Sequence, residues 1–391
     1  MIPRTKVNYC FADLARAFVI GERKHQHRER LLAMIRRFTG FELVLLTPSG
    51  RGGLCSILRA LPQTRVLVPA YTCKAVVEAA LIAGKTVVHA DVEEDGFNMT
   101  ASSLLPFLNS DSIVIATHQF GIPCDITAIA DLCRQHGAPL IEDVAAALGS
   151  RVAGRLVGSF GDAAFYSFDS TKLITVPLKA GFVTVRDPAL FAQIAASHRA
   201  QTELMPLLAK FRLLVLGAVL LALQNPMLYR CFHQVMFAWR RRCTQDSAVL
   251  DTTIGAFYRY DFAEWQAAIA CPQFARIDDL IRKRQDLYQL FSRELAGCNR
   301  FELPPPDLRR DWACIRFPLR IRGDKIAFYR QASRQGVDFA FSFTFIVAPP
   351  SCPRAHALAA AVLDPPYFDR LSIAEAQYVV KILIALENSR E

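Results

Sequence analysis

The chain has 391 residues, of which 46 are Lys or Arg and 36 are Asp or Glu, so its formal net charge is +10. This length exceeds the ~250 to 300 residues at which a single core stops growing, and it predicts two domains. The basic balance favours an anionic partner, such as a phosphorylated metabolite, a nucleotide or a lipid headgroup surface. Nucleic acid is not an expected partner, because the arginines are spread along the chain without a recognised binding motif.

The first residues and the cysteines favour a cytoplasmic protein. MIPRTKVNYC meets charge too early to form the apolar part of a signal peptide. The 11 cysteines are scattered, odd in number and never in a CxxC or Cys/His ligand spacing. We therefore expect reduced thiols and no structural metal site.

From about residue 41, short apolar runs alternate with amphipathic stretches. The runs VLLTPS, RVLVPAYT and IVIATHQF each precede a helical pattern, and PLIEDV, AAFYSF and GFVTV follow. This alternation predicts an α/β fold, with a mainly parallel sheet and helices on both of its faces. SGRGG, YTC, HQFG, ED and SFDSTK all fall at the carboxyl ends of the expected strands. Because ligands bind at that edge of such sheets, these segments predict one shared pocket.

The most apolar segment covers residues 203–242 and is centred on an uncharged stretch at 213–223. That stretch is too short for the ~20 residues of a membrane span. Three interpretations remain open: a helix buried in the protein or in a dimer interface, a helix on a membrane surface, and a true span.

The pattern changes after about residue 250. Helical periodicity predicts one long helix over 262–295, followed by a strand over 314–321 and helices over 325–336 and 373–386. We therefore expect a large domain over 1–255, with an N-terminal arm and an apolar insertion near 205–240. A smaller α+β domain would follow over 256–391.

Lys172 stands out within SFDSTK. It follows an aromatic lead-in formed by Phe165, Tyr166 and Phe168, which we expect to be buried. Burial lowers the pKa of a lysine, and a neutral amine is a nucleophile. Lys172 is therefore a candidate catalytic residue.

The segments IEDVAAALGS, VGSFGDAAFYSFDSTK and VPAYTCKAVVEAALIAG resemble the sugar aminotransferases of the DegT/DnrJ/EryC1/StrS family. The resemblance runs from about Leu46 to the C-terminus. It implies a three-layer type I fold, pyridoxal 5'-phosphate as cofactor and a homodimer with the active site at the subunit interface. It also implies transfer of an amino group from an amino acid, glutamate or glutamine, to a keto group of a nucleotide-linked or lipid-linked sugar. Surface polysaccharide or secondary metabolite synthesis is the setting of such a reaction.

The resemblance assigns roles to particular residues. Lys172 matches the lysine that forms a Schiff base with the cofactor, and Asp143 matches the carboxylate that bonds the pyridine nitrogen. Ser167 matches a hydroxyl that binds the cofactor phosphate. The turn of Gly50, Arg51 and Gly52 opens a helix whose exposed NH groups also favour a phosphate.

The sequence departs from the family at several positions. Cys73 takes the place of an aromatic that stacks on the cofactor ring, a role that Tyr71 could take over. PLKA, at 177–180, replaces a glycine-rich loop, and a cross-dimer asparagine has no clear counterpart in 255–268. His118 and Lys179, the latter within PLKA, are candidate substrate contacts.

Two other functions remain open. One is a sugar dehydratase, although such relatives carry histidine in place of the Schiff-base lysine. The other is a catalytically inactive, membrane-associated assembly partner. The departures from the family support this function, and the retention of Lys172 and Asp143 argues against it.

Overall fold

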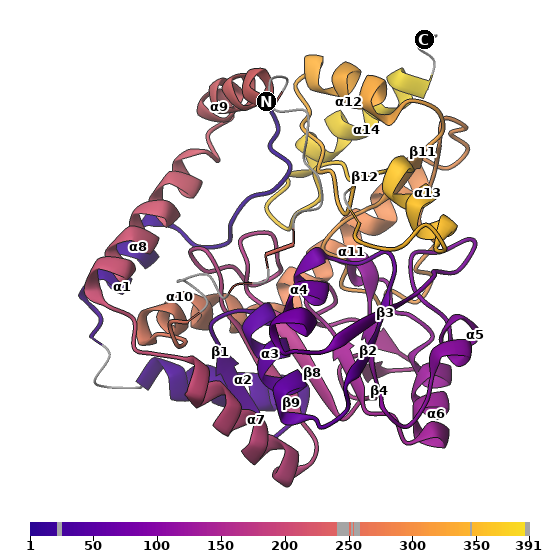
Figure 1. Cartoon of the computed structure of the whole chain (residues 1–391). Helices are drawn as coiled ribbons and strands as arrows, with labels where there is room; N and C mark the ends of the chain where they lie inside the picture. The colour runs from indigo at the N-terminus through magenta and orange to yellow at the C-terminus, as the bar shows by residue number, and fades with distance from the viewer. Residues whose placement is uncertain (22–25, 241–249, 252, 254–258, 345, 388–391) are drawn as a thin grey trace.

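The computed structural model describes residues 1–391 except 22–25, 241–249, 252, 254–258, 345 and 388–391. Its centre is a seven-stranded sheet of order β1-β9-β8-β5-β4-β2-β3 (Figure 1). Every strand pair from β3 across to β8 is parallel, and β9 pairs antiparallel with both β8 and β1. The expected mainly parallel sheet is therefore confirmed. Its strands are β1 (Val44–Thr47), β2 (Arg65–Pro69), β3 (Thr86–Ala90), β4 (Ser112–Thr117), β5 (Leu140–Asp143), β8 (Ala163–Ser167) and β9 (Gly181–Val185).

Helices cover both faces of this sheet. Along β2, Val66 and Val68 pack with α3 and α4, whereas Leu67, between them, packs with α5 and α6 on the opposite face. Successive side chains of a strand point to opposite faces, so apolar runs such as RVLVP suit a sheet buried on both sides. The helices packed around this sheet are α2 (Gln26–Thr39), α3 (Gly50–Ala60), α4 (Lys74–Ile82), α5 (Ala101–Leu104), α6 (Ile126–His136), α7 (Pro188–Gln201) and α10 (Glu264–Phe274). The last of these lies beyond residue 255, the expected end of the large domain.

A second core lies under the C-terminal part of the chain, around a three-stranded antiparallel sheet. The strand expected over 314–321 is shorter in the structure, since β11 begins only after Pro318, which lacks a backbone donor. The elements are α11 (Ile277–Glu294), β10 (Phe301–Glu302), β11 (Leu319–Ile321), α12 (Lys325–Arg334), α13 (Pro353–Ala361), β12 (Val362–Leu363) and α14 (Ile373–Glu387).

The single long helix expected over 262–295 is wrong. Two helices occupy this range, because α10 ends at Phe274 and α11 begins at Ile277, with Pro272 in the last turn of α10. Proline lacks the NH that continues a helix and crowds the preceding turn. Trp265 of α10 packs in the core under the large sheet, whereas Phe291 of α11 packs in the C-terminal core.

The apolar segment forms two helices, α8 (Leu207–Ala222) and α9 (Pro226–Arg240), at one side of the molecule (Figure 1). The axes of α8 and of residues 226–235 differ in direction by 106°. Within the described part of the chain, no single helix is both long and apolar enough to cross a membrane. An N-terminal helix that the sequence patterns did not indicate, α1 (Phe11–Val19), lies beside α8.

Candidate active site

A cavity of about 720 Å³ lies where the carboxyl ends of β4, β5 and β8 face the C-terminal part of the chain. Its volume falls within the ~300 to 1,000 Å³ of sites that bind small molecules. The large domain contributes the starts of α3 and α4, the strand ends and the loop after β8. Ile315, Arg316 and residues 340–344 contribute the opposite wall.

Lys172 and Asp143 both line this cavity. Asp143, the last residue of β5, accepts hydrogen bonds from the Ala145 amide at 3.0 Å and the Thr117 hydroxyl at 3.5 Å. Burial raises the pKa of the Asp143 carboxyl, although the Ala145 amide and Lys172 oppose this. Burial lowers the pKa of the Lys172 amine, against the carboxylates of Asp169 and Asp143. The arrangement therefore favours a neutral amine, which is the form that acts as a nucleophile or a base.

A tight turn holds Lys172 in place. The Asp169 carboxylate accepts hydrogen bonds from the Thr171 amide at 3.1 Å and from its hydroxyl at 3.2 Å. The Lys172 amide donates to the Asp169 carbonyl at 2.9 Å. Sequence reasoning did not single out Asp169, although an Asp whose side chain bonds the backbone two residues on is a known turn former.

The start of α3 forms a position suited to an anion. Ser49 caps the helix by accepting a hydrogen bond from the Gly52 amide at 2.9 Å, and Ser49 and Gly50 line the cavity. A Cβ on Gly50 would lie 3.4 Å from the Ser167 Cβ, and one on Gly181 would lie 3.0 Å from the Gly50 nitrogen. The helix start is thus packed against the end of β8 and the beginning of β9. Helix N-termini favour anions such as phosphates, and Ser167 lines the cavity beside this one, so the residues present fit a phosphate group.

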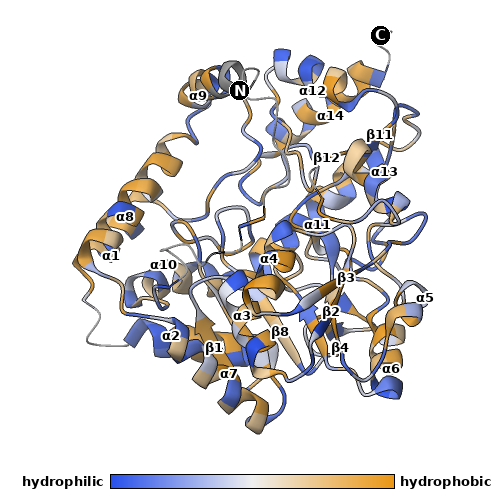
Figure 2. Cartoon of the chain, in the orientation of Figure 1, coloured by the Kyte–Doolittle hydropathy of each residue, from blue (hydrophilic) through white to orange (hydrophobic). Residues whose placement is uncertain are grey.

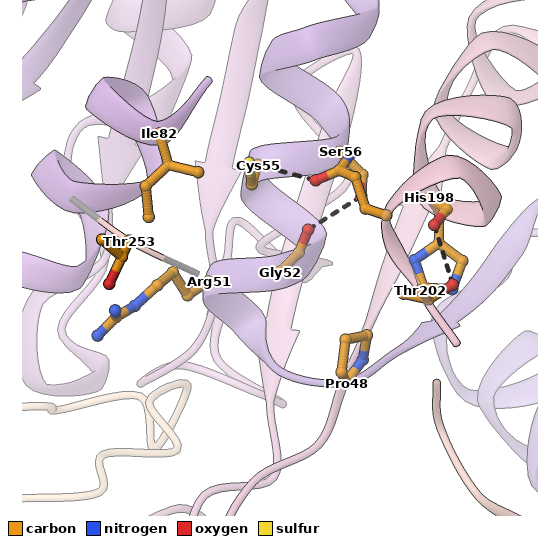
Figure 3. Close-up of a pocket in the computed structure, with 10 residues that line it drawn as sticks. Pro48, Arg51, Gly52, Cys55, Ser56, Ile82, His198, Thr202 and Thr253 are labelled. Carbon is orange, nitrogen blue, oxygen red and sulfur yellow. Dashed lines mark hydrogen bonds between the residues drawn. The ribbon is translucent and has the colours of Figure 1, made fainter. Parts of the chain in front are cut away.

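Arg51 lines the cavity, and its guanidinium forms an ion pair with the buried Glu78 at 2.7 Å. On the other side of α3, a separate hollow of about 20 Å³ lies between Arg51, Gly52, Cys55 and His198 (Figure 3). That volume holds about one water molecule, so it excludes this hollow as a cofactor site. Gly52 contacts the hollow and not the large cavity.

Cys73 and Tyr71 occupy different environments. Cys73 lines the cavity and is exposed to it, and the protein around the thiol raises its pKa by limiting its contact with bulk water. Tyr71 is fully buried, and its ring lies 5.6 Å from that of Phe343 and 6.1 Å from that of Phe120. Phe343 and Phe120 line the cavity, which leaves Tyr71 behind the wall. In this arrangement Tyr71 does not offer a ring face to a ligand.

The two candidate substrate contacts also differ. Lys179 lines the cavity, and its carbonyl accepts a hydrogen bond from the Gln266 side chain at 2.9 Å. Its neighbour Leu178 has a φ of 70°, a strained value for a residue with a side chain. His118 is fully buried outside the cavity lining, with Nε2 at 3.1 Å from the Glu142 carboxylate and Nδ1 accepting from the Cys124 amide at 3.3 Å. These bonds fit a structural histidine.

Several lining residues were missed by sequence reasoning. Arg4 comes from the N-terminal segment, and its Nε donates to the buried Asp338 at 2.8 Å. Arg316 comes from the C-terminal domain, where burial lowers the pKa of its guanidinium and Asp364 opposes this. The signal for Arg316 was available in CIRFPLRI, since an arginine inside an apolar run needs an anionic or polar partner. The region in which the cross-dimer asparagine was sought includes residues 254–258, which lie outside the described residues.

Comparisons with known proteins point to one family. A family model described as the DegT/DnrJ/EryC1/StrS aminotransferase family matches residues 21–384. The chain is 36% identical over 146 residues to a UDP-N-acetyl-3-dehydro-alpha-D-glucosamine 3-aminotransferase of Acidithiobacillus ferrooxidans, covering 36% of the chain and 40% of that protein. It is 28% identical over 233 residues to a GDP-perosamine synthase of Vibrio cholerae, covering 59% of the chain and 52% of the relative.

The two curated relatives are thus matched over about half of their length or less. The solved structures cover the whole fold. The sugar aminotransferase CalS13 of Micromonospora echinospora superposes with a TM-score of 0.76 at 21% identity, over 98% of this chain and 100% of that one. At this identity the likeness shows the fold alone, which is the type I fold expected from the sequence.

Proposed function

Because the chain belongs to the DegT/DnrJ/EryC1/StrS aminotransferase family, we propose that it is a pyridoxal-phosphate-dependent aminotransferase. It moves an amino group from an amino acid to a keto group of a sugar. The observation that carries this proposal is the meeting of Lys172 and Asp143 in one cavity, where burial lowers the pKa of the lysine amine. Transamination needs such an amine and a carboxylate in one site.

The residues of the cavity fit the cofactor. Lys172 would bond it covalently, Asp143 would contact its pyridine nitrogen, and Ser167 with the start of α3 would hold its phosphate. When bound, the cofactor supplies a ring that accepts electrons from the reacting carbon. The Asp143 carboxylate keeps a proton on the ring nitrogen, and Thr117 and Ala145 orient that carboxylate. The Lys172 amine takes the Cα proton of the amino donor.

The charges of the cavity suit its proposed substrates. Arg4, Lys179 and Arg316 all line it and provide positive charge for the carboxylate of an amino donor and the phosphates of an activated sugar. Glutamate or glutamine is the proposed donor, and a nucleotide-linked or lipid-linked keto sugar is the proposed acceptor. The named relatives act on nucleotide sugars, which supports the first form of acceptor. We further propose a cytoplasmic homodimer.

Lys172 also separates this proposal from the dehydratase alternative, whereas turnover separates it from the inactive partner. Dehydratases of the family are expected to carry histidine at that position, so a lysine favours transamination. An inactive assembly partner would bind the cofactor without converting it.

The test is the visible absorption of the purified protein with pyridoxal phosphate, before and after L-glutamate or L-glutamine. We expect a band from the lysine-bound cofactor that bleaches with the donor, and we expect Lys172→Ala to lack that band. Lys74→Ala is the matched control, because Lys74 lines the same cavity and pairs with Glu78 at its rim. Loss of the band in both variants, or retention in both, contradicts the role of Lys172. A band that no amino donor bleaches contradicts transamination.

A further inference from the structure

One side of the molecule carries an exposed apolar surface, formed by α8 and α9 (Figure 1). We call it the α8–α9 surface. Leu207, Phe211, Val215 and Val219 follow one another at four-residue spacing along one face of α8, and all four are exposed. Leu207 is 82% exposed and Phe211 54%. Figure 2 shows hydrophobic residues along almost the whole of α8. Contiguous apolar side chains of this size mark an interaction site on a soluble fold.

The opposite face of α8 is fixed to the protein. Gly217 sits so close to α1 that a Cβ there would lie 3.2 Å from Leu14, and 2.9 Å from Pro177. Lys210 donates to the carbonyls of Phe18 at 3.2 Å and Ile20 at 2.6 Å, at the end of α1. The apolar residues of α8 therefore divide between two faces, one packed on the large domain and one exposed.

The charge of this region has one sign. Residues 204–245 contain six Lys or Arg and no Asp or Glu. Arg212 of α8 and Arg230 of α9 are exposed. Apolar side chains flanked by arginines match the requirements of a helix that lies in the interface of an anionic bilayer.

Length and geometry argue against a span. Sixteen residues make α8 about 24 Å long, which is shorter than the ~30 Å of a bilayer core. The 106° bend turns α9 away from the direction of α8. Helix α8 and residues 226–235 are long and apolar enough for a span only when taken together, and the bend between them, with one face of α8 packed on the protein, favours a position on the membrane surface.

A second copy of the chain fits this surface less well. A two-fold contact places the same patch on both partners. The arginines of one copy would then approach those of the other, and the segment supplies no carboxylate to pair with them. An anionic lipid surface complements both the charge and the apolar side chains.

We propose that the α8–α9 surface binds an anionic lipid bilayer. This goes beyond the proposed reaction and does not depend on it. Two contacts join the bilayer-binding helices to the cavity. Pro177, against which Gly217 packs, belongs to the loop that carries Lys179. On α9, the Tyr229 hydroxyl donates to Asp338, which holds Arg4.

The test is co-sedimentation of the purified full chain with vesicles of phosphatidylcholine, with and without phosphatidylglycerol, at low and high salt. We expect binding to the anionic vesicles that weakens with salt. Phe211→Glu with Val215→Glu removes two apolar side chains from contact, and we expect the partition coefficient to fall at least about tenfold. Leu308→Glu with Ile373→Glu is the matched control, since both residues are exposed elsewhere.

A second variant tests the charge separately. Arg212→Gln with Arg230→Gln keeps the apolar face, and we expect it to weaken binding to anionic vesicles at low salt but not at high salt. Absence of binding by the folded parent chain overturns the proposal, as does unchanged binding by the Phe211 and Val215 variant. Light scattering of the same samples measures their oligomeric mass and tests whether a second copy of the chain covers the surface. A variant that lowers the oligomeric mass and leaves vesicle binding unchanged assigns the surface to a second copy instead.

Discussion

Glu142→Gln and Asp143→Asn each remove one charge from neighbouring carboxylates of β5, and we expect opposite effects on stability. The Glu142 carboxylate is buried and contacts His118. It also accepts three backbone hydrogen bonds, from the amides of Gly158 and Phe160 at 2.6 Å and of Gly161 at 2.7 Å. A carboxamide has only one accepting oxygen, so its NH₂ group would face two of these donors. Each buried donor left without an acceptor costs about 1 to 3 kcal/mol. We therefore expect Glu142→Gln to lower the free energy of unfolding by about 2 to 5 kcal/mol.

Asp143→Asn should leave stability unchanged or raise it. Burial raises the pKa of Asp143 in the folded chain, so its ionised form opposes folding at neutral pH and an uncharged amide removes that cost. The same change abolishes transamination under the proposed function. Urea unfolding followed by circular dichroism measures both variants, with the exposed Glu94→Gln as a control expected to stay within about 0.5 kcal/mol of the parent. This reasoning would be refuted if Glu142→Gln unfolded at the same urea concentration as the parent, or if Asp143→Asn lost as much stability as Glu142→Gln.

Three further predictions concern the cavity. Burial lowers the pKa of the Lys172 amine, and the Asp143 carboxylate partly offsets this shift. The rate of pyridoxal phosphate incorporation should therefore reach half its maximum below pH 10.5 in the parent chain, and at a lower pH still in Asp143→Asn. An unchanged or higher midpoint pH in the variant contradicts this prediction. Cys73 is exposed to the cavity, but the pKa of its thiol is raised by the surrounding protein, so its alkylation by iodoacetamide should be slow near pH 7. Pyridoxal phosphate should slow it further by covering the side chain, as peptide mass spectrometry can measure. Equal labelling with and without cofactor would place the cofactor elsewhere. Asp338→Asn should lower the free energy of unfolding by about 2 to 3 kcal/mol, because it removes the buried carboxylate that pairs with Arg4. Urea titration measures this change, and an unchanged urea midpoint argues against the ion pair.

The residues that sequence reasoning found share one property. Lys172, Asp143 and Ser167 each end or follow an apolar run, so the topology of a parallel sheet is enough to bring them to one edge. Arg4 and Arg316 reach the same cavity through packing between parts of the chain that are far apart in sequence. No local pattern marks such an approach.

The differences between expectation and structure have physical causes of the same kind. The periodicity over 262–295 is helical throughout, but a proline and two separate cores divide it into α10 and α11. His118 lies at a strand end, as expected, yet its side chain turns away from the cavity to meet Glu142. Strand position fixes where a residue lies, whereas the face to which it points depends on the register of the strand.

That dependence gives β5 an unusual sensitivity. Glu142 and Asp143 carry the same functional group, yet one anchors the turn at 158–161 and the other faces the cavity. A slip of one residue in the pairing of β5 with β4 and β8, toward the cavity, would put Glu142 in the place of Asp143 and Ile141 in the place of Glu142. Composition, charge and hydropathy would all be unchanged, while the turn would lose its anchor and the cavity would receive the longer side chain. Insertions or deletions within this strand should therefore be far more damaging than most substitutions on its flanks.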